Sequence, residues 1–192
     1  MELIITQSER YAFQKNEPLF SLDKGKLKCF LAILILSGYN QLPSERHYWD
    51  SEKDMNHQLV SGAMRRDRFL EIKRFLHLND NDDQDSDKLY KLRPLIQALK
   101  TRFLKFFVPS QNLSYDECMV KYFGKHSSKQ CIRNKPIRFG YKVWCLNAVN
   151  GYLVNFDIYT GKNNNVTTEQ EKAFGKATAP LINMLDDIPS EI

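Results

Sequence analysis

The chain has 192 residues, of which 42% are hydrophobic and 27% are charged, and its formal net charge is +5. This composition fits one globular domain or two small ones, and it excludes an intrinsically disordered chain. The 8 glycines and 7 prolines are too few for a collagen-like or linker-dominated protein.

Positive charge is concentrated in one central segment of the sequence. Residues 116–150 contain seven lysines and arginines against Asp116 and Glu117, which gives a net charge of +5, whereas residues 151–192 have a net charge of −3. A local basic segment of this kind attracts phosphate groups. A solvated basic surface without any ligand explains the same charge, so the pattern by itself leaves both interpretations open.

The cysteines and the longest apolar run indicate the cellular environment for which the chain is suited. Cys29, Cys118, Cys131 and Cys145 form no Cys-x-x-Cys pair, which argues against a zinc site within this chain. Their mostly apolar or strand-like surroundings predict reduced, packed thiols in an intracellular protein. The first residues lack a signal-peptide pattern, and the eight-residue apolar run at 29–36 is far shorter than the roughly 20 residues that span a bilayer.

The first half of the sequence predicts helices. Residues 24–37 have the pattern of a core helix that stops at Gly38, and 39–57 is predicted to be a loop with anchoring aromatic residues. Residues 59–77 place apolar side chains at helical spacing and predict a second helix. A third helix is predicted at about 92–107, with a proline in its first turn, where proline is tolerated.

An acidic run covers residues 79–87. An EF-hand calcium loop requires Gly at its sixth position and Glu at its twelfth. Counted from Asp80, those positions hold Asp85 and Lys91, so a solvated acidic loop is the better prediction.

The periodicity then becomes strand-like. Three strands are predicted, at residues 113–122, 141–149 and 152–159. The dipeptide Asn150-Gly151 between two apolar runs predicts a hairpin with a type I′ turn, which requires a positive φ at both residues. A polar loop at 162–168 leads to a final predicted helix at 169–186. The predicted order is therefore helices, three strands and a helix.

Asp116 and Glu117 lie in the first predicted strand, just before the basic segment. Adjacent strand residues point to opposite faces, so only one of the two carboxylates is expected to face a site. A strand carboxylate near positive charge suits a magnesium ligand at a phosphate-cleaving centre, but such a centre needs two or more carboxylates. On local grounds alone, an acid in a salt bridge is the commoner explanation.

Several basic residues are candidates for contact with DNA. In the central segment they alternate with the aromatic residues Tyr122, Phe139, Tyr141 and Trp144, a pattern that suits contacts along a DNA backbone. A strand with one solvated face and one packed face would show the same pattern. The candidates are Arg65 and Arg66 in the second predicted helix, followed by Lys125, Arg133, Lys135, Arg138 and Lys142.

A set of short segments resembles the piggyBac transposases. The segments are residues 48–49, 64–69, 74–77, 79–81, 114–117, 122–126, 132–136, 138–144, 151–152 and 159–162. Each segment is weakly specific by itself, but their common order is specific, and the resemblance covers nearly the whole chain. It is strongest to the domesticated, transposable-element-derived members of the family.

The resemblance implies an α+β fold in two parts. Residues 1–110 are expected to form a helical dimerisation and DNA-binding region. Residues 111–192 are expected to form the first part of an RNase H-like catalytic domain, with three strands and a helix, cut short. Because the strand that should follow is missing, one edge of this sheet is expected to be unpaired.

The resemblance also implies a catalytic role for Asp116. Family members cleave and join DNA with metal ions held by three aspartates, and the first of these falls on Asp116. The second lies in an Asp-Asn-(Phe/Trp)-Phe-Thr-Ser motif that this sequence lacks, since Asp186-Asp187 is followed by Ile-Pro-Ser-Glu-Ile. The third aspartate and the cysteine-rich zinc domain are also missing. Magnesium is therefore expected in the complete family site but not stably bound by this chain, and cleavage by the chain is not expected.

Three functional hypotheses follow from the sequence. The chain is a DNA-binding fragment of a transposase-derived protein that is inactive as an enzyme, or part of an active metal-dependent transposase whose remaining exons are missing, or a domesticated module for protein interaction and dimerisation. The expected partners are DNA and, in a homodimer, a second copy of the chain, with no membrane and no small-molecule substrate. The nucleus is the expected location because the family acts on DNA.

Overall fold

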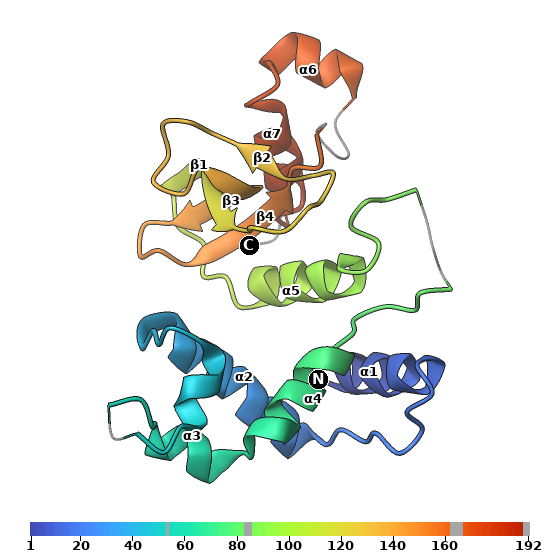
Figure 1. Ribbon diagram of the computed structural model, residues 1–192. Coiled ribbons are helices and arrows are strands. Elements are labelled where there is room, and N and C mark those ends of the chain that lie inside the picture. Colours follow the sequence, from blue (N-terminus) through green and yellow to red (C-terminus); the bar gives the residue numbers. More distant parts are fainter. Residues whose placement is uncertain (53, 83–85, 162–166, 190–192) are drawn as a thin grey trace. The chain divides into compact units, whose positions relative to one another are not determined.

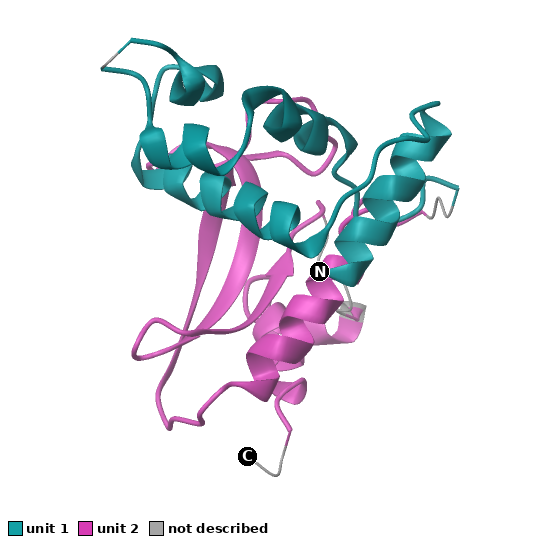
Figure 2. Ribbon diagram, turned by 90° about the horizontal axis from the view of Figure 1, so that it is seen from below, with its two compact units in different colours: residues 1–84 teal, residues 85–192 magenta. Residues whose placement is uncertain are grey.

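The computed structural model describes residues 1–52, 54–82, 86–161 and 167–189 (Figure 1). The chain divides into two compact units, Met1–Gln84 and Asp85–Ile192 (Figure 2). The sequence had suggested a boundary at 110/111, whereas helix α5 (Arg93–Lys105) belongs to the second unit because its apolar side packs on the sheet there. Within the described residues, no helix has the length and apolar character needed to cross a membrane.

The first unit is a set of helices around one apolar core. Its elements are α1 (Glu2–Gln14), α2 (Lys24–Tyr39), the 3-10 helix η1 (Glu45–Trp49), α3 (Gln58–Ala63) and α4 (Arg66–Phe75). The core is centred on Leu27 and Phe30 of α2 and on Phe69 and Ile72 of α4, all fully buried. Helix α2 begins where predicted because the Asp23 carboxylate accepts a hydrogen bond from the Lys26 backbone N–H at 2.8 Å. Helix α1 and η1 were not predicted.

The single helix predicted at 59–77 is wrong, because the chain breaks it at Met64 and Arg65. Met64 has an extended backbone, with φ −152° and ψ 141°, and its side chain is buried in the core. Its carbonyl oxygen accepts a hydrogen bond of 2.6 Å from the indole Nε1 of Trp49. This contact satisfies a carbonyl that the helical pattern would have used internally, so α3 ends at Ala63 and α4 begins at Arg66.

The prediction of a solvated acidic loop is wrong at Asp80. Its side chain is buried, forms an ion pair with Arg10, and accepts hydrogen bonds from the Asp82 backbone N–H at 3.1 Å and from Gln14 Nε2 at 3.0 Å. The backbone hydrogen bond from Asp82 is the main cause that lowers the pKa of Asp80, with Gln14 and Arg10 adding to it. The rest of the predicted loop includes residues 83–85, which lie outside the described part of the chain.

The second unit is an antiparallel sheet with helices on both faces. Its elements are α5, β1 (Leu113–Lys121), β2 (Gln130–Cys131), β3 (Phe139–Ala148), β4 (Leu153–Ile158), α6 (Thr168–Phe174) and α7 (Ala179–Asp186). The three predicted strands are confirmed, and the two-residue strand β2 is an addition. Strand β3 is central, since it pairs with β1 along one edge and with β4 and β2 along the other. No other strand within the described residues pairs with β1, so β1 forms the edge of the sheet.

The alternation of β3 divides its side chains between two packed layers. Val143 packs with Ile96 of α5 and with Phe156 of β4. The next residue, Trp144, belongs to the opposite layer, which includes Met184 of α7. Figure 1 shows α5 and α7 separated by the sheet. The mixed helical and sheet content confirms the expected α+β class.

The hairpin between β3 and β4 forms as expected, but the predicted type I′ turn is wrong. Gly151 has a φ of +84°, whereas Asn150 does not have a positive φ. The Gly151 N–H donates to the Ala148 carbonyl at 2.9 Å, and the Ala148 N–H donates to the Tyr152 carbonyl at 2.9 Å. The loop therefore has three residues and only one left-handed position, which the glycine occupies. The Asn150 side chain instead accepts a hydrogen bond from the Tyr152 N–H.

The final helix predicted at 169–186 is two helices. Helix α6 begins at a capping box in which the Thr167 hydroxyl accepts from the Gln170 N–H at 3.1 Å and Gln170 Oε1 accepts from the Thr167 N–H at 2.9 Å. The helix ends at Gly175, which has a φ of +81°. A right-handed helix requires a negative φ, so the helix cannot continue through this residue. Of the polar loop predicted at 162–168, residues 162–166 lie outside the described part of the chain.

Candidate nucleic-acid interface

Asp116 lies in the middle of β1, directly opposite Cys145 of β3, and its side chain is exposed. One carboxylate oxygen accepts a hydrogen bond from the Glu117 backbone N–H at 2.7 Å. This hydrogen bond is the largest cause that lowers the pKa of Asp116, and the charges of Lys135 and Lys142 lower it further. The carboxylate is therefore ionised at neutral pH.

Glu117 points to the other face of the sheet, as strand alternation requires. It lies opposite Trp144 and is partly buried, and its carboxylate forms an ion pair with Lys135 at 3.2 Å. In the part of the chain that the structure describes, no three His, Cys, Asp or Glu side chains lie together as a metal site. The described residues therefore do not fit a two-metal centre by themselves, since Asp116 alone offers a carboxylate on its face of β1.

Lys142 is held against an aromatic ring. Its ammonium nitrogen lies 3.6 Å from the centroid of the Trp144 ring, and the Trp144 ring stacks on Tyr115 with centroids 5.4 Å apart. Burial lowers the pKa of Lys142, and the negative charge of Glu117 opposes that effect. Lys135 and Lys142 thus have partners within the protein and are partly buried, whereas the predicted contacts Lys125, Arg133 and Arg138 are exposed.

Two phenylalanines are exposed where β1 ends and β3 begins. Phe123 is 80% exposed and Phe139 is 51% exposed. The Lys121 ammonium lies 4.9 Å from the Phe123 ring centroid, and the Lys129 ammonium lies 5.6 Å from that of Phe139. Lys129 also donates hydrogen bonds to the carbonyls of Phe123, at 3.3 Å, and Gly124, at 3.1 Å, so one lysine joins both aromatic positions.

We call Lys121, Phe123, Lys125, Lys129 and Phe139 the sheet-end surface. Lys125, a predicted DNA contact, is exposed in the loop that follows β1. Sequence reasoning counted Lys121 and Lys129 in the basic segment but did not select them or Phe123 as site residues. The signal was present, because Lys121 and Phe123 are two residues apart, yet only the return of the chain at β3 brings Phe139 beside Lys129.

Arg133 and Arg138, two further predicted contacts, are exposed in the turn that joins β2 to β3. The Ile132 N–H donates to the Arg138 carbonyl at 2.9 Å, which closes this turn and holds the two arginines on one short segment. Both belong to the same unit as the sheet-end surface.

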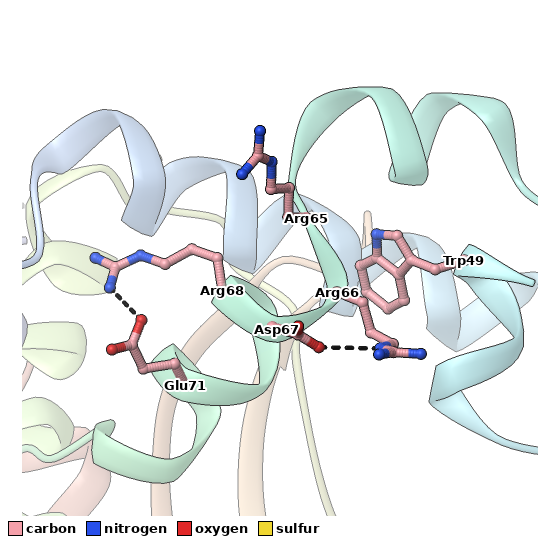
Figure 3. A pocket seen from close by; sticks show the side chains of 6 residues that line it. All are labelled: Trp49, Arg65, Arg66, Asp67, Arg68 and Glu71. Atoms are coloured by element: carbon pink, nitrogen blue, oxygen red, sulfur yellow. Dashed lines mark hydrogen bonds and ion pairs between the residues drawn. The ribbon is translucent and has the colours of Figure 1, made fainter.

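Arg65 and Arg66 lie in the first unit, at the start of α4. Figure 3 shows them in an open pocket of about 520 Å³, together with Trp49, Asp67, Arg68 and Glu71. Arg66 pairs with Asp67 at 3.1 Å and Arg68 pairs with Glu71 at 2.5 Å. The Arg65 side chain is exposed and points away from these two ion pairs (Figure 3).

Comparison with known proteins agrees with the resemblance found in the sequence. The profile of a family described as transposase IS4 matches residues 1–191. Human PiggyBac transposable element-derived protein 3 is 48% identical over 171 residues, which cover 88% of this chain and 29% of that protein. Human PiggyBac transposable element-derived protein 2 is 46% identical over 158 residues, which cover 82% of this chain and 26% of that protein.

A solved structure shares the fold. It is a cryo-EM structure of a piggyBac transposase synaptic complex with hairpin DNA, and it superposes with a TM-score of 0.74 at 18% identity. The match covers 94% of this chain and 40% of that chain. This chain belongs to the transposase IS4 family, and within it to the piggyBac transposases and the proteins derived from them. It spans less than a third of the length of these curated relatives.

Proposed function

We propose that this transposase-derived chain binds DNA through the sheet-end surface. The observation that carries the proposal is the pair of exposed phenylalanines, Phe123 and Phe139, each with a lysine ammonium over its ring. Lysine charge neutralises phosphates and releases counterions, and an exposed aromatic ring offers a platform for an unpaired base. The structural relative is a piggyBac transposase synaptic complex with hairpin DNA, and this supports DNA as the ligand.

The predicted contacts divide into two groups by their environment. Lys125, Arg133 and Arg138 are exposed and are free to reach phosphates. Lys135 forms an ion pair with Glu117, and the negative charge of Glu117 also acts on Lys142, so this carboxylate offsets both lysines and we assign neither a direct phosphate contact. Arg65 lies in the other unit and would add a second, separate contact.

We also propose that the chain does not cleave DNA by itself. In the complete family site Asp116 would supply one carboxylate ligand to Mg²⁺, and the other ligands would come from outside the residues present here. The alternative, an active metal-dependent transposase, therefore applies to a longer protein that contains this chain. Incubation of the chain with labelled hairpin DNA and Mg²⁺ or Mn²⁺ should give no cleavage products, and metal-dependent products that disappear in Asp116→Ala would overturn this proposal.

The DNA-binding proposal is tested by fluorescence anisotropy with a labelled hairpin DNA at several salt concentrations. The double variant Lys121→Ala/Lys129→Ala should lower the affinity and reduce the slope of log K against log salt by roughly 2, one phosphate contact for each lysine. The matched control is Lys28→Ala/Lys172→Ala, which removes the same charge from exposed positions of α2 and α6. An equal loss in both double variants would show non-specific attraction and would contradict the proposed surface.

The aromatic part of the surface needs its own variant. Phe123→Leu keeps an apolar side chain but removes the ring, so it should weaken binding to the unpaired loop of a hairpin more than binding to blunt duplex DNA. Identical affinities of Phe123→Leu and the unchanged chain for both DNAs would remove the stacking contact from the proposal.

A role in dimerisation is a second candidate, favoured by exposed apolar side chains in the first unit. Ile35 and Tyr39, one turn apart on α2, are 71% and 77% exposed, and Leu59 of α3 is 75% exposed. Light scattering across a concentration series should detect a dimer that Ile35→Lys disrupts; a monomer at all concentrations would dismiss this role.

A nuclear location is proposed only as a consequence of DNA binding, and fluorescence microscopy of the tagged chain tests it.

A further inference from the structure

Two cysteines face each other across neighbouring strands, on the face of the sheet that carries Asp116. Cys118 of β1 pairs in register with Val143, and Cys145 of β3 pairs with Asp116, so the two cysteines occupy diagonal positions on one face. Their sulfur atoms are 3.7 Å apart, and the Cys145 thiol can donate a hydrogen bond to Cys118 Sγ. Both are free thiols, as are Cys29 and Cys131.

The two thiols have different environments. Cys118 is exposed on the edge strand, so a small solute reaches its sulfur from solvent. Cys145 is partly buried beside the core residues Val143 and Phe156. Burial is the main cause that raises the pKa of Cys145 to about 12, and the charge of Cys118 contributes to the rise. Cys118 is therefore the thiol that reacts first, and Cys145 is placed to react second.

We propose that Cys118 and Cys145 form a reversible oxidative modification site, in which hydrogen peroxide converts the two thiols to an intramolecular disulfide between β1 and β3. Diagonal cross-strand positions are roughly 7–8 Å apart, slightly more than the separation that a disulfide usually spans, so closure of the bond requires a small backbone shift. Strand β1 has a free edge among the described residues, so it can move the remaining distance toward β3 without breaking a ladder on its other side.

The oxidation proceeds in two balanced steps. The Cys118 thiolate attacks one oxygen of hydrogen peroxide, the O–O bond breaks, and the leaving hydroxide takes a proton to become water, which leaves Cys118 as a sulfenic acid. The Cys145 sulfur then attacks the Cys118 sulfur, the S–O bond breaks, and the second hydroxide leaves as water with the Cys145 proton. Two thiols lose two electrons in total, and one peroxide gains them.

The first step makes the second easier. Thiolate charge on Cys118 is one of the causes of the raised pKa of Cys145, and a sulfenic acid carries no such charge. The remaining cysteines are placed elsewhere, since Cys29 lies on α2 in the other unit and Cys131 lies on β2, along the opposite edge of β3 from Cys118.

The test treats the whole chain with a small excess of hydrogen peroxide, stops the reaction with catalase, and alkylates the remaining thiols under denaturing conditions. Mass spectrometry should show two alkylated cysteines in place of four, with the tryptic peptides that contain Cys118 and Cys145 joined and lighter by two hydrogen atoms. Dithiothreitol should restore all four. The Cys131→Ser variant, which removes another exposed thiol, should still link Cys118 to Cys145 and leave one alkylated cysteine of its three, whereas Cys145→Ser should stop at oxidised, unlinked Cys118.

A second measurement avoids oxidation and any variant. Phenylarsine oxide binds two neighbouring thiols together, so one equivalent should protect both Cys118 and Cys145 of the native chain from alkylation while Cys131 still reacts. Protection of neither cysteine, or peroxide products in which Cys118 is over-oxidised or linked to a second chain while Cys145 stays free, would overturn the proposal.

Discussion

A Cβ atom on Gly140 would lie 2.0 Å from the carbonyl oxygen of Val120, on the adjacent strand β1. Only a glycine allows the two backbones to approach so closely at the point where β3 enters the sheet. Gly140→Ala should therefore force the strands apart and lower the free energy of unfolding by roughly 1–3 kcal/mol. Urea unfolding followed by circular dichroism measures the change.

The control for Gly140→Ala is Gly38→Ala in helix α2, where a Cβ atom would meet nothing within 4 Å. Alanine favours a helix over glycine, so this substitution should raise the free energy of unfolding by roughly 0.5–1 kcal/mol. Similar effects of the two substitutions would contradict the proposed role of close approach at Gly140.

Asn155 should be important for the stability of the second unit. Its fully buried side chain donates from Nδ2 to the Met184 carbonyl at 3.2 Å and to Asp187 Oδ2 at 3.0 Å. Asn155→Leu keeps a similar volume but leaves the Met184 carbonyl without this donor, so we expect a loss of about 1–3 kcal/mol. Asn112→Leu, at an exposed position before β1, is the matched substitution and should change stability by less than about 0.5 kcal/mol.

We expect Asp187 to make the stability of the chain depend on pH. Burial raises its pKa, but hydrogen bonds from Asn155 and Lys100 and the charge of Lys100 outweigh burial, so the pKa is lowered overall. A lowered carboxyl pKa stabilises the folded chain above the pKa of the unfolded state, and that contribution disappears as the pH falls through the folded pKa. Asp187→Asn should therefore be less stable than the unchanged chain at neutral pH, and the difference should vanish in acid.

Thermal unfolding from pH 7 down to pH 3 measures this convergence. Asn155 and Lys100 contact Asp187 and not the neighbouring residue Asp186, so Asp186→Asn is a control with the same change of charge. If the difference between Asp187→Asn and the unchanged chain stayed constant over this pH range, the contribution of Asp187 would not depend on its ionisation.

Trp49 should stabilise the break between α3 and α4. Its indole N–H donates to the Met64 carbonyl, and its ring packs against Phe69 with centroids 5.1 Å apart. Trp49→Phe removes the donor and should cost about 1–3 kcal/mol, since the carbonyl loses its partner. Tyr39→Phe, which removes a hydroxyl from an exposed side chain of the same unit, should change stability by no more than about 0.5 kcal/mol. Equal effects in denaturant titrations would exclude the hydrogen bond as the cause.

The sequence by itself determined the family, the class of fold and most of the regular elements. Residues 24–37, 92–107 and the three strands were found because a face that packs on a core imposes a periodicity of 3.6 or 2 on the side chains of one element. It also predicted that Asp116 and Glu117 point apart, since strand alternation is a local property of the backbone.

Only the tertiary structure decided which distant residues meet. The break at Met64 depends on a donor from Trp49, and the burial of Asp80 depends on Arg10 and Gln14 of α1. The register between β1 and β3 places Cys118 beside Cys145, and the return of the chain at β3 brings Phe139 to Lys129. These contacts join positions far apart in the chain, so no local pattern records them, and they are fixed only when the core selects one register and one packing.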